Sequence, residues 1–216
     1  MKDYTFRYGD GTVCLALDEK QVLGELHGNL VPPIEDIPAA LASALESPID
    51  LPALKKWLTP GDRVTLIISD MSRFWMRQDR VIPPLVNYIN ACGIPDGDLT
   101  ILVANGTHDG GDEKELRTLV TDEIFDRVRV VNHDCNAPDL VYLGTTPHDT
   151  PVWVNALAAK ADKVICLGAA THHVMAGFGG GRKSILPGVS GMQTICHNHL
   201  RARPGLPAQQ PAHRQR

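Results

Sequence analysis

The stretch HHVMAGFGGGRKSILPG, which begins at residue 172, combines several groups that could do chemistry. Two histidines come first, and a run of glycines then leads into an arginine and a lysine. The residues of this run are Gly179, Gly180, Gly181, Arg182 and Lys183. Glycines bring no side chain to a core and cost backbone entropy to order, so packing does not account for them. Three uses remain open: a phosphate cradle, a metal site or a reactive lysine.

The sequence GFGGGRKS is close to the P-loop pattern G-x-x-x-x-G-K-[ST], but it departs from that pattern in two ways. Arg182 stands where the pattern has a glycine, and ILPG follows in place of a helix that would hold a phosphate at its N-terminus. These departures argue against a nucleoside triphosphate. Successive backbone N–H groups together with Arg182 could still surround a single phosphate. Lys183 is a candidate nucleophile, and the alternative is a surface loop with a solvated lysine.

Histidines gather around the ends of predicted strands and in the region after the glycines. They are His108, His172, His173, His197 and His199. An imidazole can take and give protons near neutral pH, or bind a metal through its neutral nitrogen. A lone histidine is usually structural, and the H-x-H pair is weak as a metal motif without further ligands. Several histidines at one edge of a sheet indicate a functional site.

The motif SDMSR supplies Asp70 and Arg73 directly after a predicted strand. An arginine in this place can bind a carboxylate or a phosphate through two parallel hydrogen bonds. The alternative interpretation is a local ion pair between Asp70 and Arg73, or a helix cap made by Asp70.

Strand and helix patterns alternate along the chain. Buried-type strands are predicted at residues 63–69, 99–104, 128–134 and 163–170, and helical patterns at 37–45, 51–58, 82–93, 112–120 and 156–162. Continuous apolar strands that alternate with helices are typical of a parallel sheet covered on both faces. The predicted fold class is therefore α/β, with a mostly parallel, doubly wound sheet. Residues 6–17 and 22–33 are expected to add an N-terminal β accessory element, either a hairpin or two strands, and residues 151–155 a short extended piece.

In such sheets, ligands bind beyond the carboxyl ends of the strands. Asp70 and Arg73 follow one predicted strand, His108 follows the next, and the two histidines at 172 and 173 follow the last. This convergence is the main reason to expect a site at that edge.

The bulk properties describe an ordinary globular protein of 216 residues, 43% of them hydrophobic, with a net charge of −4. The negative charge argues against a nucleic-acid binder. No apolar run is long enough for a membrane span, and no secretory signal is visible, so a cytoplasmic location is expected. The five cysteines are widely spaced without a C-x-x-C motif, and we expect reduced, mostly buried thiols. Residues 201–216 hold four arginines and no acid, and are predicted to be a disordered basic tail.

The order of the motifs resembles the nickel-pincer lactate racemase family. The motifs are SD-x-x-R, then NGTH at residues 105–108, TPVWVN, the glycine-lysine stretch, and the histidine pair after TIC. The resemblance covers about residues 1–200. It implies that this region is the N-terminal, cofactor-binding α/β domain of such a protein.

The resemblance assigns roles to individual residues. Lys183 stands where the family tethers its cofactor covalently, a nickel pincer (pyridinium-3,5-bisthiocarboxylic acid mononucleotide nickel), and His199 stands where a histidine ligates the nickel. His108 and His173 match the two acid/base histidines, with His172 as an alternative to His173. Arg73 matches an arginine that orients the substrate carboxylate, and Asp70 belongs to the same loop. We infer that Gly179, Gly180, Gly181 and Arg182 hold the phosphate of the mononucleotide.

The implied activity is the racemisation of a small-molecule 2-hydroxy carboxylate of the lactate type. Racemisation requires the hydrogen on Cα to leave and return, and the family's cofactor supplies an acceptor for it as a hydride. One histidine removes the hydroxyl proton, and the opposite histidine serves the opposite enantiomer.

The resemblance stops just after His199, where the family continues into a C-terminal domain that closes over the cofactor. The change in composition there suggests a truncated or frameshifted reading frame, or a natural short variant. The short chain is then expected to be inactive alone, or to need a separate chain that supplies the missing domain. A cofactor-binding module without catalysis and a zinc hydrolase are the rival hypotheses. The lack of Glu or Asp near the histidines counts against the hydrolase.

Overall fold

The computed structural model describes residues 1–174 and 176–201. The chain divides into two compact units: the first is Met1–Glu35, and the second begins at Asp36. The predicted disordered tail lies outside the described residues, apart from Arg201 at the end of a helix.

The first unit contains a β-hairpin. Strand β1 (Lys2–Tyr8) pairs antiparallel with β2 (Gly11–Leu17), and a short 3₁₀ turn, η1 (Glu19–Gln21), follows. The predicted accessory β element is therefore confirmed as a hairpin. A strand within residues 22–33 is wrong, because that segment has no regular structure. Glycines at 24 and 28 and the prolines at 32 and 33 weaken any strand there, since glycine adds no side chain to pack and proline cannot donate to a ladder.

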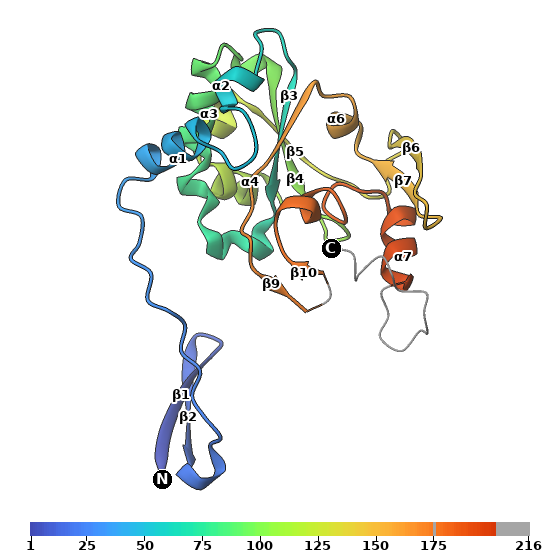
Figure 1. The fold of residues 1–216 in the computed structure, drawn as a ribbon. Coiled ribbons are helices and arrows are strands. Elements are labelled where there is room, and N and C mark those ends of the chain that lie inside the picture. Colours follow the sequence, from blue (N-terminus) through green and yellow to red (C-terminus); the bar gives the residue numbers. More distant parts are fainter. Residues whose placement is uncertain (175, 202–216) are drawn as a thin grey trace. The chain divides into compact units, whose positions relative to one another are not determined.

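The second unit is built on a four-stranded parallel sheet (Figure 1). Its strands are β3 (Val64–Ser69), β4 (Leu99–Ala104), β5 (Arg129–Asn132) and β8 (Lys163–Cys166), in the order β5-β4-β3-β8. Val64 at the start of β3 lies opposite Leu99 on one side and Lys163 on the other. The four predicted strands and their parallel arrangement are confirmed.

Both faces of this sheet are covered, as the fold class predicted. Leu66 and Ile68 of β3 pack into a core with the helices α1 (Ile37–Glu46), α2 (Leu54–Trp57), α3 (Ile82–Ala91), α4 (Glu113–Val120) and α5 (Asp122–Arg127). Ile67, which points the other way, packs against α6 (Ala156–Ala159) and β7 (Pro151–Val154). Because alternate residues of a strand face opposite sides of the sheet, the apolar residues of β3 pack into a core on each face. A second antiparallel hairpin joins β7 to β6 (Val141–Thr145).

Local sequence signals explain where several elements begin and end. Asp112 and Glu115 form a reciprocal capping box at the start of α4. Helix α3 has proline in its first turn and is followed by Gly93 at φ +94°. Short pieces complete the unit: η2 (Met71–Met76), η3 (Gln78–Arg80), η4 (Asp96–Asp98), β9 (His172–His173), β10 (Gly177–Phe178), η5 (Gly181–Ser184) and α7 (Met192–Arg201).

The five cysteines are all free thiols, but the expectation that most are buried is wrong. Only Cys135 is buried; Cys92 is half-buried, and Cys14, Cys166 and Cys196 are exposed. The exposed three lie on the hairpin, at the last residue of β8 and on α7, where no core packs over them. Within the described residues, no helix is long and apolar enough to cross a membrane.

Candidate active site

A cavity of about 310 Å³ lies beyond the carboxyl ends of the parallel strands. The chain runs outward from β3 through β4 to β5 and then returns to place β8 on the other side of β3. The loops after β3 and β8 therefore leave the sheet at a topological switch point, which is where open α/β sheets bind ligands. Residues from the loops after β3, β4 and β8 and from the glycine run line this cavity.

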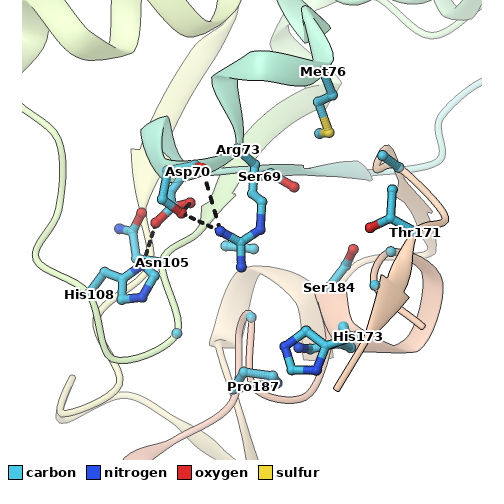
Figure 2. Close-up of a pocket in the computed structure, with 18 of the residues that line it drawn as sticks. Ser69, Asp70, Arg73, Met76, Asn105, His108, Thr171, His173, Ser184 and Pro187 are labelled. Carbon is cyan, nitrogen blue, oxygen red and sulfur yellow. Dashed lines mark hydrogen bonds and ion pairs between the residues drawn. The ribbon is translucent and has the colours of Figure 1, made fainter. Parts of the chain in front are cut away.

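Most of the predicted site residues meet in this cavity (Figure 2). Its lining includes Asp70, Arg73, His108, His173, Gly179, Gly180, Lys183 and His199. Gly181 and Arg182 instead line an adjoining cavity of about 690 Å³, which shares Gly179, Gly180 and Lys183 with the first. His173, and not His172, lines the first cavity; the ring of His172 lies 4.9 Å from the ring of Phe178.

Asp70 and His108 form a close pair. Asp70 Oδ2 lies 2.5 Å from His108 Nδ1, although the two residues come from different loops. Asp70 is mostly buried, with 15% of its side chain exposed, whereas His108 is more than half exposed. A carboxylate on Nδ1 favours the tautomer with the proton on that nitrogen and leaves Nε2 able to accept a proton.

The same carboxylate also organises Arg73. Ser72 Oγ donates to Asp70 Oδ1 at 2.6 Å and accepts from Arg73 Nη1 at 3.1 Å. Both alternatives from the sequence, a direct Asp70–Arg73 ion pair and a helix cap by Asp70, are therefore wrong. The Asp70 side chain makes no cap hydrogen bond to η2. Ser72 links Asp70 to Arg73, and Figure 2 shows the Arg73 side chain between His108 and His173.

His173 lies in a positively charged part of the cavity. Its Nδ1 accepts a hydrogen bond from the backbone N–H of Ala176 at 3.2 Å. Burial lowers the pKa of His173 below its usual 6.5, and the positive charges of Lys183, Arg73 and His199 lower it further. The neutral imidazole is therefore favoured at neutral pH.

The glycine run is shaped by backbone contacts that only glycine allows. Gly180 has φ +67° and ψ −173°, a conformation that is essentially restricted to glycine. A Cβ there would lie 2.7 Å from the carbonyl oxygen of Ala169. A Cβ at Gly188 would collide with the carbonyl oxygen of Ser184. The chain around Lys183 is thus closely packed against the strand-end loop after β8.

The lysine loop and the His108 loop are tied together through their backbones. The N–H of Gly106 donates to the carbonyl of Gly188 at 2.9 Å, and the N–H of Gly188 donates to the carbonyl of Lys183 at 3.0 Å. This connection sets the position of the lysine backbone relative to the turn that carries His108.

His199 contacts the backbone of its own helix, α7. Its Nδ1 lies 3.0 Å from the carbonyl oxygen of Ile195. When the ring is neutral, this contact favours the tautomer with the proton on Nδ1, so that Nε2 is the nitrogen with a lone pair to offer. The described residues contain no group of three His, Cys, Asp or Glu side chains that could hold a metal ion by themselves.

Three buried polar residues near the site were not singled out by side-chain chemistry in the sequence. Gln78 and Asn105 hold the ends of β3 and β4, and the Oδ1 atom of Asn105 is buried without a partner among the described residues. His133 lies between the backbone carbonyl of Ser190 and the amide of Asn155. A buried acceptor without a partner, such as Asn105 Oδ1, costs about 1–3 kcal/mol of folding free energy, and Asn105 lines the cavity.

The fold and this cavity define an α/β domain with a candidate ligand-binding site at the carboxyl edge of its sheet. Residues 8–206 match the lactate racemase N-terminal domain family, and the chain belongs to that family. The lactate racemase of Thermoanaerobacterium thermosaccharolyticum is 31% identical over 179 residues, which is 79% of this chain and 42% of that protein. The lactate racemase of Lactiplantibacillus plantarum is 31% identical over 157 residues, 72% of this chain and 37% of that protein.

Solved structures agree with this assignment. The lactate racemase apoprotein from Thermoanaerobacterium thermosaccharolyticum superposes with a TM-score of 0.81 at 28% identity and covers 99% of this chain. A protein from Thermotoga maritima has a TM-score of 0.57 at 23% identity over 74% of this chain, which is a likeness in fold alone. The chain spans 51% and 39% of these two structures, so it corresponds to about half the length of its relatives or less.

Proposed function

We propose that this chain is the cofactor- and substrate-binding domain of a 2-hydroxy acid racemase of the lactate type. The observation that carries the proposal is the convergence of His108, His173, Arg73, Lys183 and His199 on one cavity at the switch point of the sheet. Membership of the lactate racemase N-terminal domain family supports the same activity.

The donor set fits a nickel pincer mononucleotide bound through Lys183. The tether needs a lysine in the cavity, and Lys183 lines it. His199, whose Nδ1 contacts the Ile195 carbonyl, would offer its Nε2 to the nickel. The glycine run brings backbone close enough to hold a phosphate, with Arg182 beside it. When bound, the pincer complex supplies a carbon that can accept the hydrogen of Cα with its electron pair.

The substrate carboxylate binds Arg73 in this proposal. The guanidinium is already held by Ser72 Oγ, so less side-chain entropy is lost when a carboxylate binds. Bidentate pairing with a carboxylate then fixes the orientation of the substrate between the two histidines.

His108 and His173 act as acid and base for the substrate hydroxyl. Nε2 of His108 accepts the proton for one enantiomer, because Asp70 keeps the proton of that ring on Nδ1. His173 serves the other enantiomer, and its lowered pKa favours the neutral ring at neutral pH. Because its Nδ1 accepts from the N–H of Ala176, this hydrogen bond has to open before the ring takes the proton. A reaction whose two products are mirror images needs such a base on each side.

The zinc hydrolase alternative has no support, because the described residues contain no three-ligand cluster for a metal. The chain spans only 42% and 37% of the curated racemases that it matches. We therefore propose that the domain is completed by a second half of the racemase type, in the same or in a separate polypeptide.

The test is to produce the chain in cells with nickel and the cofactor pathway, and to measure its intact mass. We expect an adduct, which peptide mapping would locate on Lys183. If no adduct forms under these conditions, the cofactor assignment is wrong. The Lys183→Arg variant keeps the charge but cannot form the same linkage, and serves as the control. Conversion of D- to L-lactate is then measured with and without the C-terminal half of the Thermoanaerobacterium enzyme. No racemisation by the loaded chain in either mixture would exclude the activity.

A further inference from the structure

We propose that two buried side-chain amides, Gln78 and Asn105, are positioning residues that hold the Asp70–His108 pair in register. The two amides would build the acid/base group of the proposed racemase, so their functional meaning rests on that assignment. Their structural effect can be tested without it.

Gln78 secures the end of β3. Its side chain is 1% exposed, its Nε2 donates to the carbonyl of Ser69 at 2.7 Å, and its Oε1 accepts from the N–H of Ser69 at 3.3 Å. One amide thus satisfies both backbone groups of the last residue of the strand, as a neighbouring strand would. Asp70 is the next residue. The chain returns to Ser69 because Arg77 adopts a left-handed conformation, φ 52° and ψ 46°, just before Gln78.

The side chain of Asn105, the first residue after β4, fixes the backbone there in a similar way. It is 2% exposed, and its Nδ2 donates to the carbonyl of His133 at 3.1 Å and to Asn132 Oδ1 at 3.2 Å. The Asn132 amide is itself fixed by Gly111, which donates to its Oδ1 and accepts from its Nδ2. The backbone carbonyl of Asn105 accepts from the N–H of His108 at 2.9 Å, so the anchored residue closes the turn that carries the histidine.

The two anchors act at the same level of the sheet. Ser69 and Ala104 are paired in the parallel ladder, so Asp70 and Asn105 each follow the last rung. Beyond that rung the β3–β4 ladder ends, and Gly106 donates instead to the carbonyl of Gly188. The 2.5 Å contact between Asp70 and His108 needs both chain ends fixed, and the two amides add to the restraint that the Gly106–Gly188 hydrogen bond supplies.

The test uses the isotopically labelled full chain and long-range proton–nitrogen NMR of the histidine rings. In the wild type we expect His108 to carry its proton on Nδ1. In Gln78→Leu and in Asn105→Leu, which keep the side-chain volume but remove the hydrogen bonds, we expect the ring to average between both tautomers. Gln78→Glu keeps an acceptor for the Ser69 N–H but loses the donor, so an intermediate change is expected. If Gln78→Leu does not fold, the His108 tautomer is measured in Gln78→Glu instead.

Asn90→Leu is the matched control. Asn90 also donates from a partly buried amide to a backbone carbonyl, that of Ile94 at 2.9 Å, but it lies on α3 and does not line the cavity. Unchanged His108 ring signals in the folded Gln78 and Asn105 variants would overturn the proposal. A change of the same size in Asn90→Leu would overturn it as well, because the effect would then be one of general stability.

The NMR result is separate from the proposed function, because it needs neither cofactor nor turnover. If the wild-type chain fails to load or racemise while the His108 tautomer responds to the amides, the racemase assignment fails and the positioning role stands. If the loaded enzyme is active, we expect Gln78→Leu to lower kcat roughly tenfold or more with little change in KM, since a displaced base affects proton transfer more than binding.

Discussion

At the scale of the residue, Asp70 accepts hydrogen bonds in two directions, from His108 through Oδ2 and from Ser72 through Oδ1. An asparagine there would present an N–H group to one of these partners. We expect Asp70→Asn to lower kcat by roughly a hundredfold or more, because the tautomer that leaves Nε2 of His108 bare is no longer favoured. Steady-state rates of the loaded enzyme in both directions measure this effect.

Asp162→Asn is the control for that substitution. Asp162 also accepts from a cation, with 3.0 Å between its Oδ2 and Arg63 Nε, but this pair is exposed and lies at the opposite edge of the sheet. It should leave kcat unchanged. An Asp70→Asn enzyme that racemises at the wild-type rate would show that Asp70 does not control the state of His108.

The sequence predicted most of the residues that line the cavity, but not how they pair. Asp70 and His108 were found because each follows a buried strand, and parallel strands end at one edge. Their direct contact joins residues 38 positions apart, and it depends on how two loops leave the sheet. Gln78 was missed for the same reason. A glutamine in a polar loop gives no sign that it will turn back to the backbone of Ser69.

At the scale of the element, the glycine run depends on the conformation of Gly180. We expect Gly180→Ala to destabilise the chain by about 1–3 kcal/mol, because its backbone lies in a region that only glycine adopts easily. The new Cβ would also clash with the carbonyl oxygen of Ala169, a backbone atom that can shift only if the chain itself moves. Urea unfolding measures the stability, and mass spectrometry measures how far Lys183 is loaded.

Gly97→Ala is the matched control for the glycine run. A Cβ added at Gly97 would meet nothing within 4 Å, and its φ is not positive, so the change should be close to neutral. Equal stability of the Gly180→Ala and Gly97→Ala proteins would contradict the role given to Gly180.

The elements were predicted with unequal success, for physical reasons. The central strands β3 and β4 are buried on both faces and therefore appear as continuous apolar runs, and the outer strands β5 and β8 are mostly half-buried but still rich in β-branched residues. β6 lies largely exposed in a hairpin, so its pattern was too weak to mark it. β9 and β10 are two-residue strands within the glycine stretch, and they exist because the chain folds back on itself there, which no local pattern reports.

At the scale of the whole molecule, His133 makes stability depend on pH. Its Nε2 hydrogen bonds to the Ser190 carbonyl and its Nδ1 accepts from Asn155, so the folded state needs the neutral ring. Burial lowers the pKa of His133 below 6.5. Below pH 6.5 the unfolded chain therefore binds a proton at this position that the folded chain does not, and the free energy of unfolding falls as the pH falls.

His133→Gln removes this titration. We expect the variant to be less stable than the wild type at pH 7, by about 1–3 kcal/mol for the lost buried hydrogen bonds. The difference should shrink between pH 7 and pH 5, because only the wild type loses stability through this group. Urea unfolding at several pH values measures it, and a difference that stays constant or widens toward pH 5 would be the contrary result.

The division into two units predicts where the chain can be shortened. Both core clusters are formed by residues between Leu58 and Val189, and no residue of Met1–Glu35 is buried. A chain that begins at Asp36 keeps the N-cap of α1, whose side chain accepts from the N–H of Ala39. We expect its free energy of unfolding to change by less than about 1 kcal/mol, as for other changes at exposed positions.

A further truncation to Pro48 is the control, because it removes α1 with Leu41 and Leu45, which pack against the larger core. Loss of two partly buried leucines should cost about 2–5 kcal/mol or more. All the residues that line the 310 Å³ cavity follow Asp36, so the chain that begins at Asp36 should still load cofactor on Lys183. If this shorter chain unfolds as readily as the one that begins at Pro48, the hairpin unit contributes to the stability of the α/β unit and the two are not independent.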